Sequence, residues 1–232
     1  GAGGGTWRVR DQDHIAGVYR GAAHSQCNLQ LRTTCRMAVF IHNFRGYDSH
    51  LIAAAFTHFK GMAMQVIGQG LEKYMSLTWD TTIVFKDSLQ FLSGTLEAVV
   101  ACLKKGGKDK FKVLNEAFTA TTDNEGMDML LRKGVYPYDY MNHIDRFDDR
   151  KIPPIEEFFN RLCNKPCSQA DYKYADDVWK KFDCQTMRDY HDLYLKTDVL
   201  LLADVFESFR TATLSTLGLD PAYYVSGPQL SW

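Results

Sequence analysis

The chain has 232 residues, 45% hydrophobic and 13% aromatic, which is enough to bury the core of one domain. Its 27 Lys and Arg residues against 28 Asp and Glu exclude a protein-wide attraction to nucleic acid, so a DNA site would have to be a local patch. Nothing resembles a secretory leader, the six cysteines form no regular framework and the longest apolar run is too short for a bilayer, so we expect an intracellular protein without membrane attachment.

The first predicted elements are mainly strands. Residues 1–35 are polar, Gly-rich and weakly periodic, which predicts an irregular leader. The apolar run Met37–Ile41 predicts a buried strand, followed by a polar turn and a helix that starts near Ser49. Three further strands are predicted at 64–67, 74–78 and 82–85, the last two forming a hairpin closed by Asp80-Thr81.

Helices are predicted for most of the remaining chain. The last and longest begins at Thr186-x-x-Asp189 and ends near Gly218. The helices before it are predicted at 96–103 with Ser93 as N-cap, at 111–118, at 127–132, after Pro153-Pro154 and after Ser168. Because strands come first and helices follow, with a βα unit at the front, we expect an α/β or α+β domain.

Two aspartates lie where a metal-binding site could form. Asp48 follows a predicted strand and opens a helix, where the helix dipole favours its charged form. Asp198 lies four residues after Tyr194, so their side chains share one face of the last helix. Two carboxylates that meet across a cleft can hold a divalent cation, although two-metal phosphodiester cleavage needs further ligands. The alternative is that Asp48 only caps its helix and Asp198 is a solvated helix residue.

The segments around these aspartates resemble those of a known family. Asn43-x-x-x-Tyr47-Asp48 is similar to the second exonuclease motif, and Tyr194-x-x-x-Asp198 to the third, of the protein-primed (type 2) family B DNA polymerases of viruses, linear plasmids and Polinton/Maverick-type transposons. The resemblance runs over about residues 10–232. It implies an RNase H-like α/β 3′–5′ exonuclease domain with additional helices, in a fragment of a DNA-directed DNA polymerase truncated before the palm.

The resemblance also implies a role for each site residue. Asp48 and Asp198 would hold Mg²⁺ or Mn²⁺ in a two-metal site, Tyr194 would orient the attacking water, and Lys133, in the motif Lys133-Gly134-Val135-Tyr136, would assist at the scissile phosphate. The single-stranded 3′ end would be held by His42, Asn43, Tyr47 and, within a (Ser/Thr)-Leu-x-x-hydrophobic motif, Ser88 and Leu89. Without the family order, Ser88-Leu89 would be ordinary strand-end sequence and Lys133 a cation at a helix C-terminus.

The chain also departs from the family. The first exonuclease motif, Asp-x-Glu on a leading strand, is missing, and the only such spacing, Asp123-Asn124-Glu125, lies in a predicted polar loop. The palm motifs are missing as well, and both ends of the chain look cut. We therefore expect an exonuclease domain at 36–218 and the start of the connection to the palm at 219–232.

These departures limit the activity expected of the chain alone. With half of the metal cage missing, we expect a monomer that binds single-stranded DNA weakly and cleaves it little or not at all. The intact enzyme would act with a terminal (priming) protein. The sequence does not distinguish the nucleus, a virus factory or an organelle as its location.

Residues 1–35 resemble the tail half of a zinc-stabilised endonuclease VII-like module, which transposon-type members insert between their first two exonuclease motifs. His24-x-x-Cys27 would be half of a zinc site, but the upstream Cys-x-x-Cys is missing, so we expect a leader without zinc. Two alternatives to the exonuclease interpretation stay open. One is a non-catalytic DNA-binding or interaction remnant of a transposon polymerase, and the other is a zinc-dependent endonuclease centred on Asp11, His14 and Asn28.

Two further features have both a functional and a structural interpretation. The basic loop 104–110 either follows a DNA backbone or is a solvated turn. Tyr136, Tyr138 and Tyr140 either stack on bases or pack around Pro137.

Overall fold

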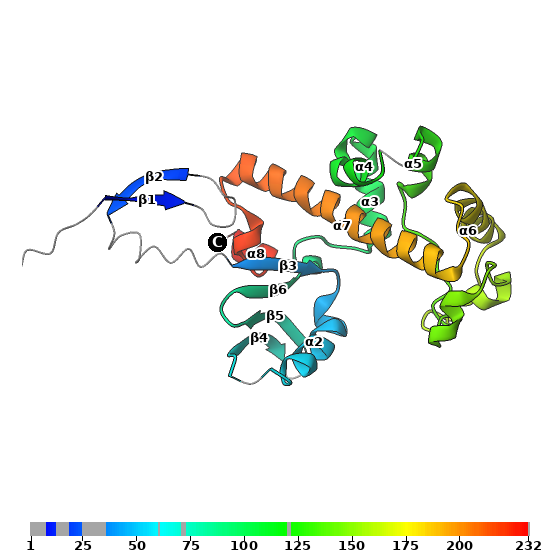
Figure 1. The fold of residues 1–232 in the computed structure, drawn as a ribbon, viewed down its shortest axis with the longest axis horizontal. Coiled ribbons are helices and arrows are strands. Elements are labelled where there is room, and N and C mark those ends of the chain that lie inside the picture. Colours follow the sequence, from blue (N-terminus) through cyan, green and yellow to red (C-terminus); the bar gives the residue numbers. More distant parts are fainter. Residues whose placement is uncertain are drawn as a thin grey trace, which may run out of the picture.

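The computed structural model describes residues 8–12, 19–24, 36–59, 61–70, 73–119 and 122–231. In this part of the chain all the strands lie before residue 88, with one α-helix among them, and the elements that follow are helices and 3₁₀ turns, as Figure 1 shows. The predicted mixture of helices and strands is therefore confirmed, whereas the RNase H-like arrangement stays a prediction.

The main sheet has four strands, β3 (Met37–Ile41), β4 (Met64–Gly70), β5 (Lys73–Trp79) and β6 (Ile83–Asp87), in the order β3-β6-β5-β4. β3 runs parallel to β6, and the other neighbours are antiparallel. All four predicted strands are confirmed. Asp80 and Thr81 close the β5–β6 hairpin with φ angles of 48° and 60°, and positive φ at both positions gives a turn whose twist matches that of the strands.

A separate antiparallel hairpin precedes this sheet, with β1 (Arg8–Gln12) paired to β2 (Tyr19–His24). The prediction of an irregular leader across 1–35 is therefore wrong for these residues. Neither strand has a strong apolar alternation. The two strands form because their backbones pair through hydrogen bonds, and no local sequence pattern reveals this pairing. Asp11 lies on β1 and His24 on β2, whereas His14, Cys27 and Asn28 lie outside the described residues, so the zinc and endonuclease hypotheses stay predictions.

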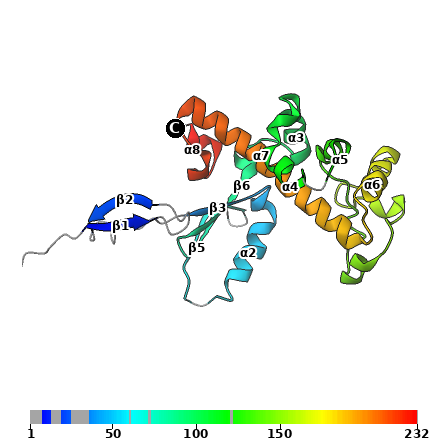
Figure 2. The same cartoon turned by 45° about the horizontal axis from the view of Figure 1, so that its top comes forward.

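One face of the main sheet packs against α2 (Asp48–Phe56), beside the sheet in Figure 2. Phe56 stacks on Trp79 of β5 with ring centroids 4.9 Å apart and contacts Phe85 of β6 at 5.6 Å. Phe44, in the 3₁₀ turn η1 (Phe44–Gly46), is fully buried and stacks on Phe85 at 6.1 Å. These contacts hold the segment after β3, which carries the predicted second motif, against the sheet.

The remaining helices pack around α7 (Met187–Leu217), which runs through the helical part (Figure 1). They are α3 (Leu96–Lys105), α4 (Lys112–Phe118), α5 (Asn124–Leu130), α6 (Gln169–Lys181) and α8 (Gly227–Leu230). Short 3₁₀ turns are η2 (Ser88–Gln90), η3 (Lys108–Lys110), η4 (Ile144–Asp148), η5 (Ile155–Phe158) and η6 (Pro221–Tyr223). Among the described residues, no helix combines the length and the apolar character that a bilayer span requires.

Two apolar cores hold the helices. The first contains Val100 of α3, Leu114 of α4 and Leu201 of α7, all fully or almost fully buried. The second contains Val178 of α6 and Met187 at the start of α7. Because α7 contributes to both cores, it joins the parts of the helical region.

The predicted caps of the two C-terminal long helices are confirmed. The Ser168 hydroxyl accepts a hydrogen bond from the Asp171 N–H at 3.0 Å and begins α6. Thr186 and Asp189 form a reciprocal capping box at the start of α7. Gly218 ends α7 with a φ of 70°, a conformation that glycine adopts without a steric penalty.

Three other predictions about where helices begin are wrong. Thr95, not Ser93, caps α3, since its hydroxyl accepts from the Ala98 N–H at 3.3 Å. Asp123-Asn124-Glu125 is not a loop, because the Asp123 carboxylate accepts from the Gly126 N–H at 2.9 Å and caps α5. After Pro153-Pro154 only the 3₁₀ turn η5 forms. In the first two cases the cap accepts a local hydrogen bond from the N–H three residues ahead, and both Thr and Asp are residue types suited to this position.

One buried carboxylate joins α7 to α4. Asp204 of α7 is 2% exposed and accepts hydrogen bonds from the N–H groups of Val113 at 2.8 Å and Leu114 at 2.9 Å. These are unpaired donors of the first turn of α4, and Phe111 at the N-cap position has no side-chain acceptor for them. Asp204 therefore acts as an N-cap supplied from another helix.

We predict that Asp204→Ala lowers the free energy of unfolding by about 3 kcal/mol, because two buried N–H groups lose their charged acceptor. Urea denaturation followed by circular dichroism measures the change. Asp192→Ala, which removes an exposed carboxylate from the same helix, is the matched control and should change stability by no more than about 0.5 kcal/mol. Equal effects of the two substitutions would contradict the capping role of Asp204.

Candidate active site

The parallel pairing of β3 with β6 brings two of the predicted motifs side by side. Ile41 at the end of β3 is paired with Asp87 at the end of β6, so His42 and Ser88 follow at the same edge of the sheet. His42 Nδ1 lies 3.0 Å from Ser88 Oγ, and His42 Nε2 lies 3.1 Å from the carbonyl oxygen of Gly94. Since a carbonyl only accepts, Nε2–H is the donor there, and in the neutral ring Nδ1 accepts from the Ser88 hydroxyl. The orientation of the His42 ring is thus set from both sides.

Asp87, which the sequence analysis did not single out, holds this edge together. Its side chain is fully buried, and Oδ1 accepts from the Leu89 N–H at 3.0 Å. Oδ2 accepts from the Arg45 N–H at 3.4 Å and lies 3.7 Å from Arg45 Nε. The carboxylate therefore ties the segment after β3 to the segment after β6. Asp87 lies at the end of an apolar strand and directly before Ser88-Leu89, and this position in the sequence could have identified it as a candidate.

Asp198 on α7 has an unsatisfied buried oxygen. Among the described residues, its Oδ1 is buried without a hydrogen-bond partner. Burial raises the pKa of the Asp198 carboxyl above its ordinary value, against the opposing effects of the Tyr194 hydroxyl, the Lys133 ammonium and the Gly134 N–H. The alternative that Asp198 is a solvated helix residue is therefore wrong. An orphaned carboxylate oxygen of this kind is suited to binding a cation.

The surroundings of Asp198 include two of the predicted catalytic residues. Lys133 lies three residues beyond the end of α5 at Leu130, in a non-helical segment, and its positive charge lowers the pKa of Asp198. Lys133 is therefore not the helix C-terminal cation of the alternative interpretation. The next residue, Gly134, lies against the Tyr194 ring, and a Cβ at this position would come within 2.6 Å of Tyr194 Cδ2. Only glycine lets the Lys133 segment approach Tyr194 so closely.

Tyr194 belongs to a cluster of tyrosines. Its ring stacks on that of Tyr136 with centroids 4.7 Å apart, and its hydroxyl is hydrogen-bonded to the hydroxyl of Tyr138. Burial raises the pKa of Tyr194 further above neutral pH, and the protonated phenol can act as a hydrogen-bond donor. Tyr138 is 52% exposed beside it. Tyr140 instead donates to Asp149 at 2.5 Å, which supports the structural interpretation for this residue.

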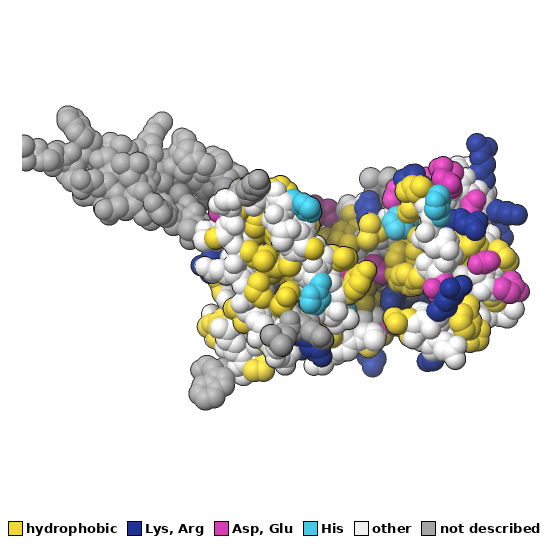
Figure 3. Space-filling view, turned by 90° about the horizontal axis from the view of Figure 1, so that it is seen from below, with side chains coloured by type: hydrophobic (Ala, Val, Ile, Leu, Met, Phe, Trp, Pro, Cys, Tyr) yellow, Lys and Arg dark blue, Asp and Glu magenta, His cyan; other side chains and the backbone are white. Residues whose placement is uncertain are grey.

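A cavity of about 480 Å³ is lined by His42 from the first of these groups and by Asp198 from the second. It lies between the end of β3 and α7, and it is lined by Ile41 and His42 on one side and by Asp198, Val199 and Leu202 on the other. Figure 3 shows that the molecule is hollowed between its sheet part and its helical part on the side shown. The fold thus brings His42 of the second-motif segment and Asp198 of the third to one cavity, although they are 156 residues apart in the sequence.

The structure places the other predicted site residues around the turn after β3 and on η2. Asn43 is exposed and has a left-handed φ of 61°, and Tyr47 is 69% exposed. Asp48 is half-buried at the first position of α2, where Tyr47 occupies the N-cap position without a side-chain cap. Leu89 is half-buried on η2, and its N–H is held by Asp87. Asp48 does not line the cavity that contains Asp198.

The donor set for a metal ion is incomplete in the part of the chain that the structure describes. No three His, Cys, Asp or Glu side chains come together there in an arrangement that could hold an ion. The orphaned Asp198 oxygen fits a cation ligand, and Asp48 is the second carboxylate that the resemblance assigns. The predicted Mg²⁺ or Mn²⁺ site therefore stays a prediction, with one ligand whose environment suits it.

The basic loop 104–110 makes contacts within the protein. Lys104 Nζ donates to the carbonyl oxygen of Leu131 at 3.4 Å, and Lys108 forms an ion pair with Asp128. Both cations therefore have protein partners, which supports the structural interpretation of this loop over a path for a DNA backbone.

Comparisons of the chain with protein-family models, with curated proteins and with solved structures find no match.

We predict that Asp198→Asn raises the stability of the protein at neutral pH. Because burial raises the pKa of Asp198 in the folded state, the native protein binds this proton more tightly than the unfolded chain does. Ionised Asp198 therefore costs stability above its native pKa, and this cost disappears below the unfolded pKa of about 4.

Urea midpoints measured between about pH 3.5 and pH 8 test this prediction. The advantage of Asp198→Asn over the native protein should be largest at the alkaline end and shrink as the pH falls. Asp192→Asn, at an exposed position of the same helix, is the control and should show no such trend. A variant less stable than the native protein at pH 8 would show that the ionised carboxylate is well compensated.

Proposed function

We propose that this chain is the 3′–5′ exonuclease region of a protein-primed family B DNA polymerase and that it has an RNase H-like architecture. The observation that carries the proposal is the orphaned oxygen of Asp198, a residue that lines one cavity together with His42 and that lies beside Lys133 and Tyr194. These residues come from three separate motifs to which the resemblance assigns one site. The second motif lies between β3, which pairs in parallel with β6, and α2.

Each side chain has a role that its surroundings support. Asp198, with Asp48, would hold Mg²⁺ or Mn²⁺, which when bound activates water and stabilises the leaving 3′ oxygen. The protonated Tyr194 hydroxyl would orient the attacking water, and the Lys133 ammonium would lie near the scissile phosphate. His42, held by Ser88 and Gly94, would position the sugar-phosphate of the 3′-terminal nucleotide.

The exposed groups after β3 would bind the single-stranded 3′ end. Tyr47 presents most of its ring to solvent, where a base can stack on it without sequence preference. The Asn43 side chain makes no hydrogen bond to the backbone of η1 and is free to contact sugar or phosphate. In the intact polymerase, which would act with a terminal priming protein, this region would proofread a frayed primer.

The part of the chain that the structure describes contains no group of three metal ligands, and this favours a second candidate function. The domain would then be a non-catalytic DNA-binding or interaction remnant that keeps the fold. The two candidates differ in Mn²⁺ binding, which the exonuclease region requires through Asp198 and the interaction module does not.

We predict that the chain binds a single-stranded oligonucleotide weakly and that Tyr47→Ala reduces this binding by about tenfold, since base stacking on an aromatic ring is worth about 1–3 kcal/mol. Fluorescence anisotropy with a 3′-labelled oligonucleotide measures the affinity. Leu162→Ala, which truncates another strongly exposed apolar side chain, is the control and should bind like the native protein.

The same oligonucleotide, incubated with Mn²⁺ or Mg²⁺, tests catalysis. We expect little or no removal of nucleotides, and a thermal stabilisation by Mn²⁺ that Asp198→Asn abolishes. Robust cleavage that Asp198→Ala abolishes would disprove the inference that the chain lacks a complete metal cage. Absence of both Mn²⁺ and DNA binding would reject the exonuclease proposal in favour of the interaction module.

A further inference from the structure

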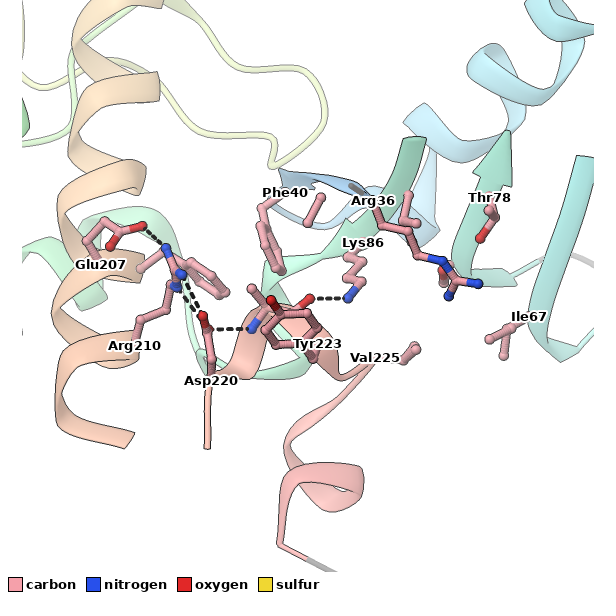
Figure 4. A pocket seen from close by; sticks show the side chains of 15 residues that line it. Arg36, Phe40, Ile67, Thr78, Lys86, Glu207, Arg210, Asp220, Tyr223 and Val225 are labelled. Carbon is pink, nitrogen blue, oxygen red and sulfur yellow. Dashed lines mark hydrogen bonds and ion pairs between the residues drawn. The ribbon is translucent and has the colours of Figure 1, made fainter. Parts of the chain in front are cut away.

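A second cavity, of about 550 Å³, lies on the opposite face of the sheet from α2 (Figure 4). Side chains alternate along β6, so Phe85 points to α2 while Val84 and Lys86 point into this cavity. The end of α7 and the segment around η6 form the other wall. The residues with charged or hydroxyl groups that line the cavity are Arg36, Ser76, Thr78, Lys86, Glu207, Arg210, Asp220 and Tyr223.

Both carboxylates that line this cavity accept hydrogen bonds from one cation, Arg210. Arg210 donates to Asp220 through Nε at 2.9 Å and through Nη2 at 2.6 Å, and Nη1 donates to Glu207 at 2.6 Å. Asp220 also accepts from the Ala222 N–H at 2.9 Å. Figure 4 shows this network on the wall formed by α7. Glu207 and Asp220 are therefore already occupied by Arg210.

The other two cations, Arg36 and Lys86, lack a carboxylate partner. In the described part of the chain neither Arg36 nor Lys86 forms an ion pair with a carboxylate. Lys86 is nevertheless only 5% exposed, and its ammonium group donates to the carbonyl oxygen of Ala222. An ammonium group has three donors, so Lys86 keeps donors for a ligand.

The burial of Lys86 is electrostatically unfavourable as it stands. Desolvation lowers the pKa of Lys86, and the positive charge of Arg36 lowers it further, whereas only Asp220 acts in the opposite direction. Buried charges in proteins are normally paired, and an anion bound between Lys86 and Arg36 would neutralise both. Ser76, which pairs with Lys86 in the β5–β6 register, and Thr78 add hydroxyl donors on the same wall.

We propose that this cavity binds a phosphate group, either as free phosphate or as a phosphate monoester, with Arg36 and Lys86 as its charged ligands. A phosphate monoester carries a charge of about −1.5 to −2 and several acceptor oxygens, which matches two unpaired cations flanked by hydroxyl donors. A carboxylate carries a single charge and leaves one cation uncompensated. The exposed ring of Tyr223 on the cavity wall offers a stacking surface for the base of a nucleotide. This inference does not rest on the exonuclease proposal.

The test compares inorganic phosphate with a deoxynucleoside 5′-monophosphate on the full 232-residue chain, by isothermal titration calorimetry and thermal unfolding. We expect phosphate to bind and to raise the unfolding temperature, and Lys86→Met and Arg36→Gln each to weaken the affinity at least about tenfold. Lys112→Met, at an exposed position of α4, is the matched control and should bind like the native protein.

The results distinguish free phosphate from a phosphate monoester as the ligand. They also test the phosphate site independently of the exonuclease proposal. Tenfold tighter binding of the nucleotide identifies the monoester as the ligand, and equal affinity identifies free phosphate. Binding should persist in Asp198→Asn, because Asp198 does not line the phosphate cavity. Arg36→Gln alters an exposed side chain and so keeps the test valid should Lys86→Met unfold the protein. Absence of phosphate binding to the native chain, or unchanged binding in Arg36→Gln and in folded Lys86→Met, overturns the proposal.

Discussion

The burial of one face of α7 is the constraint on which the rest of this structure depends. Leu201, Val205 and Phe206 lie in the larger apolar core, and the buried carboxylate of Asp204 ties the helix to the first turn of α4. Once this face is buried, helical spacing sets where every other α7 side chain can lie. Asp198 is thereby directed to the cavity at the end of β3, and Arg210 to the cavity over the opposite sheet face.

The two cavities adjoin, and their unpaired side chains carry charges of opposite sign. Both are lined by Phe40, Phe206 and Glu207, so they meet along β3 and α7. At the first cavity, an oxygen of Asp198 is buried without a partner among the described residues. At the second cavity, Arg36 and Lys86 lack a carboxylate partner in the same part of the chain. Uncompensated buried charge reduces stability, and it is commonly kept where a ligand supplies the missing charge. The cation proposed for the first cavity and the phosphate proposed for the second rest on the same physical argument.

The sequence predicted local structure well where the determining interactions are local. The strand at Met37–Ile41, the turn at Asp80-Thr81 and the capping box of Thr186 and Asp189 are all confirmed. The wrong predictions have two causes. β1 and β2 form through their mutual pairing, which has no signature within either strand. Thr95 rather than Ser93 caps α3, because the local sequence offers more than one suitable cap residue. The cap that Asp204 supplies to α4 comes from 91 residues away, and no local pattern predicts it.

The sequence by itself determined which residues are candidates for the proposed chemistry: the carboxylates of Asp48 and Asp198, the ring of Tyr194 and the hydroxyl of Ser88. Only the tertiary structure decided which of them share a cavity and which charges lack partners. It joined His42 to Ser88 and Asp198 to Lys133, and it buried Lys86 beside Arg36. The reason is physical: burial and pairing energies depend on atoms brought together from distant parts of the chain, which no local pattern contains.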